Sequence, residues 1–334
     1  MKLGSAAAAS TMLMACLALV VVLTPVCANE RVWVDTDPAC GHCYTSDPDD
    51  CFAITALLRA HDIKVVGIST VFGNAEIEVT DRIARDLGRR LAAAGVAVPP
   101  IYTGAASRRA GPSSATDGLT QALAEGPLTI AALGPLTNVS QVLTLHPHLQ
   151  ANVTRVVAVM GKRDGHVFHP AEGSRDAFLG HGPVFVDLNF TKDPQAVRAL
   201  LKTDVPIVLI PYQVARQFIM TGEDLDRLAA RGGSSTWLAM QARGWLDIWR
   251  RFMGRDGFYP FDLLAAEYIL SQDGFRCFPE LSRVTRRMRL MGGGPRALIV
   301  GPSSKSRDQP GRLVTYCVRI ESNVHDRVQR RFSN

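Results

Sequence analysis

Five aspartates stand close together in the segment 35–50, which reads DTDPACGHCYTSDPDD. Asp35 and Asp37 directly follow an apolar Val-Trp-Val run, so they lie at the end of a predicted buried strand. Asp49 and Asp50 open an apolar pattern with helical spacing, where the helix dipole stabilises each acid by only about 0.3–1 kcal/mol. That is too little to hold several anions in one crevice. Two interpretations follow: helix capping with solvated carboxylates, or a site for a hard divalent cation such as Ca²⁺.

Three further polar segments follow predicted strands. They are residues 69–74 (STVFGN), 133–138 (LGPLTN) and 186–189 (VDLN), and Asp193-Pro194 opens the next helical pattern. Each segment alone is ordinary turn chemistry. In a parallel sheet the carboxyl ends of the strands meet at one edge, where ligands bind. The four segments together therefore predict a polar, anionic crevice suited to a polyhydroxyl ligand that is held by a metal and by hydrogen bonds.

The elements that must position these residues alternate between strands and helices. We expect strands at 31–34, 63–71, 128–132, 154–160 and 206–210, and helices at 50–60, 76–94, 136–145, 194–201 and 222–230. This alternation, with continuously apolar strands, predicts an α/β fold: an open, mostly parallel sheet with helices on both faces. The chain from residue 291 on is expected to form loops and edge strands. No linker divides residues 29–334, which predicts a single domain.

The first 28 residues are predicted to be a signal peptide. A nearly continuous apolar stretch at 12–26 ends in Val26-Cys27-Ala28, a small-residue pattern suited to cleavage after Ala28. Cleavage predicts a secreted or periplasmic protein without stable membrane association. An uncleaved anchor is the alternative, and the lipoprotein-like segment 13–16 is disfavoured because the apolar run continues beyond Cys16.

The composition of the 334-residue chain is that of an ordinary globular protein, with 47% hydrophobic and 20% charged residues. Its net charge of +6 includes a basic cluster at 283–289. No motif or aromatic-basic pattern for nucleic acid accompanies this cluster, so no nucleic-acid partner is expected. A homo-oligomer remains open.

Five cysteines remain after removal of the signal peptide: Cys40, Cys43, Cys51, Cys277 and Cys317. An oxidising compartment permits disulfides, and an odd number leaves at least one thiol free or paired elsewhere. The pairing is open at this stage, with Cys277–Cys317 as one candidate. No second Cys/His pair supports zinc binding by the insert CGHC at 40–43. We expect this insert to form a surface loop that leans away from the pocket, with rim contact to the substrate as the alternative.

Taken in order, these motifs resemble the inosine-uridine-preferring nucleoside hydrolases. The resemblance covers about residues 32–266 and rests on Asp35-Thr36-Asp37-Pro38, Asp49-Asp50, Thr-Val-x-Gly-Asn, Leu-Gly-Pro-Leu-Thr-Asn, Asp-Leu-Asn-Phe and Phe261-Asp262. It implies the open α/β sheet, a bound Ca²⁺, and cleavage of the N-glycosidic bond of ribonucleosides to free base and ribose. Such a reaction belongs to purine and pyrimidine salvage.

The resemblance also implies roles for individual residues. The metal would be held by the side chains of Asp37, Asp50 and Asp262 and by the backbone carbonyl of Thr137, and Asp37 would act as base toward the metal-activated water. The substrate positions of the family match Asp49, Asn74, His181, Asp187, Asn189 and Phe261. Three of these depart from the usual pattern: Asp187 replaces Glu, His181 replaces Asn, and Phe261 replaces a His that many members have.

The group that assists departure of the base stays open. His166, His169 and His181 lie in or at the end of the Gly-rich segment 161–182 and are candidate acids. Aromatic stacking is the other route. Trp245 and Trp249 recur at helical spacing, which favours a core stripe, whereas the segment 258–261 adjoins the predicted metal ligand Asp262.

Two alternative functions remain. A nucleoside- or sugar-binding protein of the same fold, with weakened catalysis, would account for the three departures from the family pattern. An Asp-based phosphohydrolase would use Asp35 as its nucleophile with Mg²⁺. It would leave the predicted ribose-binding residues unexplained.

Overall fold

The computed structural model describes residues 29–164, 166, 168, 186–286, 296–301 and 311–333. The predicted signal peptide, His169 and His181 lie outside these residues. No helix in the described part of the chain is both long and apolar enough to cross a membrane.

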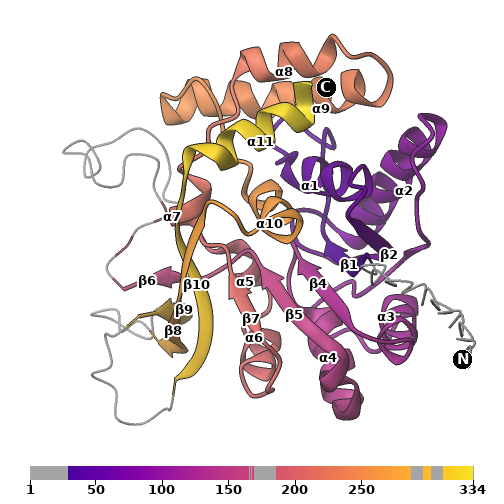
Figure 1. Cartoon of the computed structure of the whole chain (residues 1–334), viewed down its shortest axis with the longest axis vertical. Coiled ribbons are helices and arrows are strands. Elements are labelled where there is room, and N and C mark those ends of the chain that lie inside the picture. Colours follow the sequence, from indigo (N-terminus) through magenta and orange to yellow (C-terminus); the bar gives the residue numbers. More distant parts are fainter. Residues whose placement is uncertain are drawn as a thin grey trace, which may run out of the picture.

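The core is a ten-stranded sheet with the strand order β3-β2-β1-β4-β5-β7-β10-β8-β9-β6 (Figure 1). The strands are β1 (Glu30–Thr36), β2 (Ile63–Thr70), β3 (Ile101–Tyr102), β4 (Leu128–Ala132), β5 (Val153–Ala158), β6 (Lys162–Arg163), β7 (Ile207–Leu209), β8 (Phe275–Arg286), β9 (Arg296–Val300) and β10 (Arg312–Ile320). The pairs from β3 to β10 are parallel, whereas β8 pairs antiparallel with both β10 and β9. The prediction of an open, mostly parallel sheet is confirmed.

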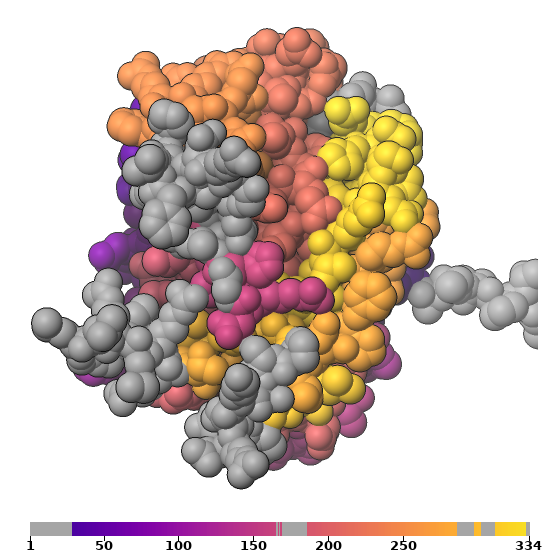
Figure 2. Space-filling view, turned by 90° about the vertical axis from the view of Figure 1, so that its left-hand side faces the viewer, coloured from indigo at the N-terminus to yellow at the C-terminus, as the bar shows by residue number. Residues whose placement is uncertain are grey.

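The helices cover both faces of this sheet. They are α1 (Asp49–Leu58), α2 (Ile77–Ala93), α3 (Ser114–Ala124), α4 (Thr137–Leu145), α5 (Leu188–Lys192), α6 (Pro194–Leu200), α7 (Tyr212–Ala215), α8 (Gly222–Ala229), α9 (Gly233–Ile248), α10 (Phe261–Leu270) and α11 (Ser322–Ser333). A short 3-10 helix at Pro147–Asn152 and a π-helical turn at Trp249–Met253 complete the set. Seen from the β6 edge, α8 and α9 form the upper surface, and β8 and β10 lie below (Figure 2).

Alternate residues of each strand enter two separate cores. Val32 and Val34 of β1 pack with α1, α2 and α8–α11, whereas Trp33 between them packs with α3, α4 and α6 on the other face. This follows from the two-residue period of a strand. A parallel sheet buried on both faces needs continuously apolar strands, which is why the strands could be recognised in the sequence.

The five predicted strands and five predicted helices are all present, with ends that differ by at most a few residues. One expectation is wrong: residues 322–333, expected among loops and edge strands, form the helix α11. Val324 and Val328 of α11 are fully buried and pack in the same core as Val32 and Val34. Val324, Val328 and Phe332 recur every four residues in the sequence, a helical spacing that the expectation of loops and edge strands overlooked.

Two disulfides stabilise the described fold. Cys277 of β8 lies opposite Cys317 of β10 and is bonded to it. The second disulfide, Cys40–Cys51, joins the insert after β1 to the first turns of α1. Cys43 is a free, exposed thiol.

Helix α1 positions two of the aspartates and is buried along nearly its whole length. Phe52 is fully buried and its ring centroid lies 6.3 Å from that of Phe258, just before α10. We expect Phe52→Ala to lower the free energy of unfolding by about 3–5 kcal/mol, because it removes a large side chain from a packed interface. Urea denaturation of the mature chain measures this. The control Leu145→Ala, at a side chain that is 55% exposed, should change it by less than about 0.5 kcal/mol. Equal effects of the two substitutions would contradict this account.

Candidate active site

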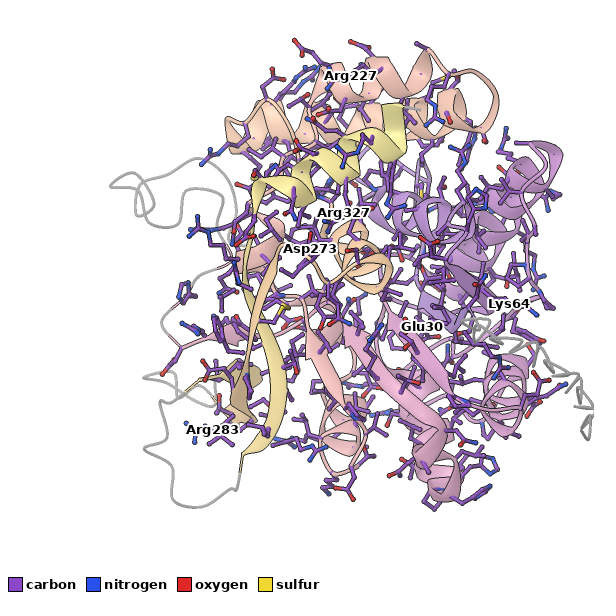
Figure 3. All side chains as sticks on the ribbon, in the orientation of Figure 1. Glu30, Lys64, Arg227, Asp273, Arg283 and Arg327 are labelled. Carbon is purple, nitrogen blue, oxygen red and sulfur yellow. A yellow bond between two sulfur atoms is a disulfide. The ribbon has the colours of Figure 1, made fainter. Side chains whose placement is uncertain are left out.

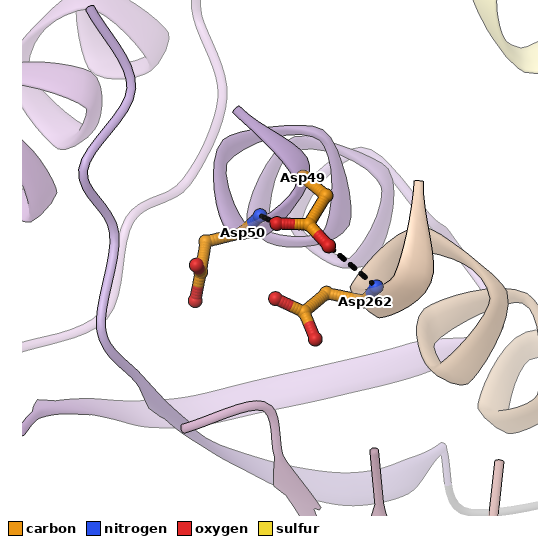
Figure 4. A group of neighbouring side chains, drawn as sticks. All are labelled: Asp49, Asp50 and Asp262. Atoms are coloured by element: carbon orange, nitrogen blue, oxygen red, sulfur yellow. Dashed lines mark hydrogen bonds between the residues drawn. The ribbon is translucent and has the colours of Figure 1, made fainter. Parts of the chain in front are cut away.

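The first turns of α1 and α10 meet at one point, and Asp49 joins them. Its Oδ1 accepts a hydrogen bond from the backbone N–H of Asp50 (3.0 Å), and its Oδ2 accepts one from the N–H of Asp262 (3.2 Å) (Figure 4). One carboxylate oxygen from each of Asp49, Asp50 and Asp262 lies within 4.8 Å of the others. All three residues are buried. The Asp49 carboxylate therefore accepts hydrogen bonds from N–H groups at the starts of two helices. Because Asp50 and Asp262 carry these N–H groups, the same contacts place three acidic side chains close together.

Asn74, which follows β2, fixes the other side of this cluster. Its backbone N–H donates to Asp37 Oδ2 (2.7 Å), and its side-chain Nδ2 donates to Asp50 Oδ2 (3.1 Å). Asp50 Oδ1 in turn accepts from the N–H of Asp37 (3.1 Å) and from the Thr36 hydroxyl. The second carboxylate oxygen of Asp37, Oδ1, is buried and has no hydrogen-bond partner in the described part of the chain.

Asp35 lies beneath this cluster and links the ends of two strands. Its Oδ1 accepts from the Ser69 hydroxyl of β2 and from Asn138 Nδ2 of α4 (2.8 Å). The same Nδ2 donates to the Thr70 carbonyl (2.9 Å), and Asn138 Oδ1 accepts from the N–H of Ala105 (2.9 Å). Asp35 thus holds β1, β2 and α4 in register rather than facing the cavity.

Burial raises the pKa of these acids. It raises the pKa of Asp35 and of Asp49 to about 7, and the negative charge of Asp50 also acts on Asp49. The pKa values of Asp37 and Asp262 are raised well above the usual range, chiefly by burial and then by the charges of neighbouring aspartates. Without a cation, this cluster therefore retains protons near neutral pH.

The donor set fits a hard divalent cation. It offers buried carboxylate oxygens from Asp37, just after β1, and from α1 and α10, and Asp37 Oδ1 has no hydrogen-bond partner among the described residues. Ca²⁺ and Mg²⁺ both take oxygen ligands of this kind. The carboxylate oxygens that approach one another come from Asp49, Asp50 and Asp262, and Asp37 adjoins this group through its N–H, which donates to Asp50 Oδ1.

Thr137 stands at the start of α4, directly after β4, and is buried. Its hydroxyl donates to Asp193 Oδ2 (2.7 Å), while Asp193 Oδ1 accepts from the N–H groups of Gln195 and Ala196 at the start of α6. Asp193 therefore holds α4 and α6 together and fixes the orientation of Thr137. The sequence indicated Asp193 only as the start of a helix.

Asn189 and Asp187 border the cavity from the segment before β7. Asn189 Nδ2 donates to the backbone carbonyls of Leu133 (2.6 Å) and Val159 (3.1 Å). These two residues directly follow β4 and β5. Asp187 accepts from the N–H groups of Gly161 (2.8 Å) and Phe190 (3.2 Å), and burial raises its pKa to about 6.

A cavity of about 340 Å³ opens above the carboxylates. Its polar wall includes Asp49, Asn74, Asp187, Asn189 and Asp262, and with Phe261 on the other wall six of the predicted site residues line one space. Its apolar wall consists of Leu133, Val159, Met160, Phe168, Val186, Leu188, Tyr212, Trp245 and Phe261. A hollow of this size, polar on one side and aromatic on the other, suits a sugar joined to a flat heterocycle.

The aromatic residues divide between this wall and the core. Trp249 and Phe258 are fully buried in the core, whereas Trp245 and Phe261 line the cavity. The core interpretation of the tryptophan stripe holds for Trp249, whereas Trp245 is partly buried, packs against the core and also lines the cavity. Tyr212 was not among the predicted residues, although it lies just after β7, where strand-end reasoning could have found it. Its ring centroid lies 5.9 Å from that of Phe261.

The insert after β1 faces the cavity, so the expectation that it leans away is wrong. His42, Cys43, Thr45, Ser46 and Asp47 all line the cavity wall. The physical reason is packing against α9. The Tyr44 hydroxyl donates to Asp247 (3.0 Å), and Gly244 lets the Tyr44 backbone approach α9 closely, since a Cβ there would lie 2.9 Å from the Tyr44 carbonyl.

Of the predicted acid candidates, only His166 lies within the described residues. Its backbone carbonyl accepts a hydrogen bond from Lys162 Nζ (2.7 Å), and it is not part of the cavity wall. His42 is on that wall. It went unrecognised because the insert was expected to point elsewhere.

The chain is similar to known proteins in both sequence and fold. The chain matches the model of the inosine-uridine preferring nucleoside hydrolase family over residues 32–323, and it belongs to that family. It is 27% identical over 238 residues to probable uridine nucleosidase 2 of Arabidopsis thaliana, with 61% of this chain and 66% of that protein covered. It is 26% identical over 230 residues to the pyrimidine-specific ribonucleoside hydrolase RihA of Citrobacter koseri, with 60% and 66% covered. The match thus spans about two thirds of the length of these relatives.

Two solved structures share the fold. A plant nucleoside hydrolase, PpNRh1, has a TM-score of 0.72 at 19% identity, and 91% of this chain and 99% of that chain are covered. A purine-preferring ribonucleoside hydrolase from Gardnerella vaginalis has a TM-score of 0.70 at 17% identity, with 91% and 98% covered.

The raised pKa values predict how stability depends on pH in the metal-free protein. Asp35 and Asp49 titrate near pH 7 when folded but near pH 4 when unfolded, so the folded state binds more protons between these values. Its free energy of unfolding should therefore fall as pH rises from 5.5 to 7.5, by about 2 kcal/mol or more. Urea denaturation with a chelator measures this, and added Ca²⁺ should stabilise more at pH 7.5 than at pH 5.5. A chelator-treated protein that is equally stable at both pH values would contradict it.

Proposed function

We propose that this chain hydrolyses the N-glycosidic bond of ribonucleosides and releases free base and ribose. The observation that carries the proposal is the position of the carboxylate cluster at the floor of a cavity with one polar and one aromatic wall. Family membership supports the reaction class, and relatives described as a probable uridine nucleosidase and a pyrimidine-specific ribonucleoside hydrolase support the substrate class.

We propose Ca²⁺ as the cofactor, held by Asp37, Asp50 and Asp262 and by the Thr137 carbonyl. A divalent cation bound there lowers the pKa of water and so supplies a nucleophile at neutral pH. Asp37, with its otherwise unpartnered Oδ1, takes the proton of the attacking water. Asp193 keeps Thr137 in place through its hydroxyl.

Asp49, Asn74, Asp187 and Asn189 line the side of the cavity where the ribose would lie. Departure of the base builds positive charge on the sugar, and neighbouring carboxylates stabilise that charge. Carboxylate and amide groups also accept and donate hydrogen bonds to the sugar hydroxyls. They hold the anomeric carbon in a fixed position relative to the water, which lowers the entropic part of the barrier.

The base would lie against Tyr212, Trp245 and Phe261. We propose His42 as the donor of the proton that the leaving base needs, because it lies on the cavity wall. Histidine is the side chain that most often acts as a general acid. This assignment gives the insert after β1 a role in catalysis. It also supplies a proton donor, which Phe261 cannot be, although many family members have a histidine at that position.

The mature chain is proposed to act after export, in a secreted or periplasmic location. The signal-like segment 1–28 and the two disulfides, Cys40–Cys51 and Cys277–Cys317, support an oxidising compartment.

Ribose release from inosine and uridine tests the reaction and the role of Asp37. We expect activity to disappear with a chelator and to return with Ca²⁺. Asp37→Asn should lower kcat by at least about 10²–10⁴-fold, since it removes both a base and a metal ligand. Asp117→Asn, at an exposed position of α3, is the matched control and should leave kcat unchanged. Nucleoside binding without any ribose release by the unsubstituted chain would instead favour the binding protein.

The role of His42 is tested with two leaving groups. His42→Asn should lower kcat for inosine at least about tenfold, because purine departure requires a proton. It should have little effect on p-nitrophenyl riboside, whose phenolate leaves without protonation. His146→Asn, on a residue outside the cavity wall, is the control. Equal losses for both substrates would show that His42 positions the substrate instead of donating a proton.

A further inference from the structure

A second hollow, of about 1090 Å³, lies at the opposite end of α1 from the carboxylate cluster. It is bordered by the segments that follow α1 and α2 and by α11. Its charged and titratable lining residues are Arg59, His61, Arg231, Arg327, Arg330 and Arg331. Among the residues that the structure describes, no acidic side chain lines it.

Most contacts of these arginines are with neutral oxygen atoms. Arg59 donates to the hydroxyls of Ser234 (3.0 Å) and Ser235 (3.3 Å), and Arg231 donates to the Arg331 carbonyl (3.0 Å). Such hydrogen bonds fix the orientation of a guanidinium group and leave its charge uncompensated. In accord with this, burial and then the nearby charge of Arg231 lower the pKa of Arg59.

Two carboxylates lie near the other arginines. Glu267 of α10 is fully buried, bonds to Arg331 Nε, and lies 3.9 Å from Arg327 Nε. Asp273 is 80% exposed and lies 3.8 Å from Arg327 Nη1, and its backbone carbonyl accepts from Arg327 Nη2 (2.7 Å) (Figure 3). Two negative charges against five guanidinium groups leave the hollow with excess positive charge.

Helix ends account for only part of this arrangement. Arg59 follows α1, Arg231 follows α8, and Arg330 and Arg331 lie in the last turn of α11, where a cation is favourable next to the free carbonyls. That explains an arginine at each helix end separately. It does not explain why arginines from three helix ends line one shared hollow with no acid among its described lining residues.

We propose that this hollow binds a soluble small molecule that carries one or more phosphate groups. Guanidinium groups form paired, charge-assisted hydrogen bonds with phosphate oxygens, and Arg is well suited to phosphate recognition. The hollow is concave and has about the volume of a small-molecule site. This favours a soluble ligand over a flat membrane surface.

Calorimetric titration of the metal-loaded mature chain with pyrophosphate tests the proposal. We expect saturable binding of one molecule per chain. The double variant Arg231→Ala/Arg330→Ala, at two exposed positions outside the proposed active site, should bind at least about tenfold more weakly. Lys202→Ala removes an exposed positive charge after α6, at the other end of the molecule from α11, and should change the affinity less than about twofold.

Pyrophosphate also binds divalent cations. The heat from that reaction should be the same for the unsubstituted chain, the double variant and Lys202→Ala. Equal affinity for the double variant and the unsubstituted chain, or no saturable binding up to about 10 mM, would overturn the proposal. Circular dichroism verifies that the variants are folded. A second arm uses vesicles of phosphatidylglycerol. Cosedimentation with vesicles in the absence of pyrophosphate binding would also overturn it, and would indicate lipid headgroups instead.

Discussion

Carboxylate groups that are removed from water and placed side by side repel one another, and this repulsion is the constraint on which the rest of the site depends. Asp37 directly follows β1, Asp49 and Asp50 lie in α1, Asp262 lies in α10, and all four are buried. Protonation, hydrogen bonds from backbone N–H groups, or a cation can each relieve the repulsion. In this protein the raised pKa values favour protonation, and backbone N–H groups donate hydrogen bonds to the carboxylates. The third is available to any divalent cation that prefers oxygen ligands.

The fold is arranged so that this cluster can exist. A parallel sheet brings the ends of β1, β2 and β4 to one edge, and the helices that follow begin there with free N–H groups. Asp49 uses two of these groups, from α1 and α10, and thereby fixes the distance between helices that are more than 200 residues apart in the chain. Asn74 and Asn138 hold the neighbouring strand ends in the same way. Loss of any of these contacts would loosen the acids and reduce their capacity to hold a cation.

Much of this arrangement could be predicted from local sequence. Strands buried on both faces are continuously apolar, and Asp or Asn after such a strand must lie at the edge where ligands bind, as holds for Asp37 after β1 and Asn74 after β2. What could not be predicted depends on contacts between distant segments. The insert at 40–43 faces the cavity because Tyr44 packs on α9, and Tyr212 reaches the wall because α7 follows β7 directly. Helix α11, by contrast, has a helical signal in its own sequence, since Val324, Val328 and Phe332 recur every four residues.

The central claim is that protons occupy the buried carboxylates until a cation replaces them. Calorimetric titration of the chelator-treated mature chain with Ca²⁺ at pH 6.5, in two buffers with different ionisation enthalpies, measures this exchange directly. The raised pKa values predict one saturable site and the release of about one proton or more per Ca²⁺ bound. Saturable binding with no proton release, or no saturable binding, would contradict the account.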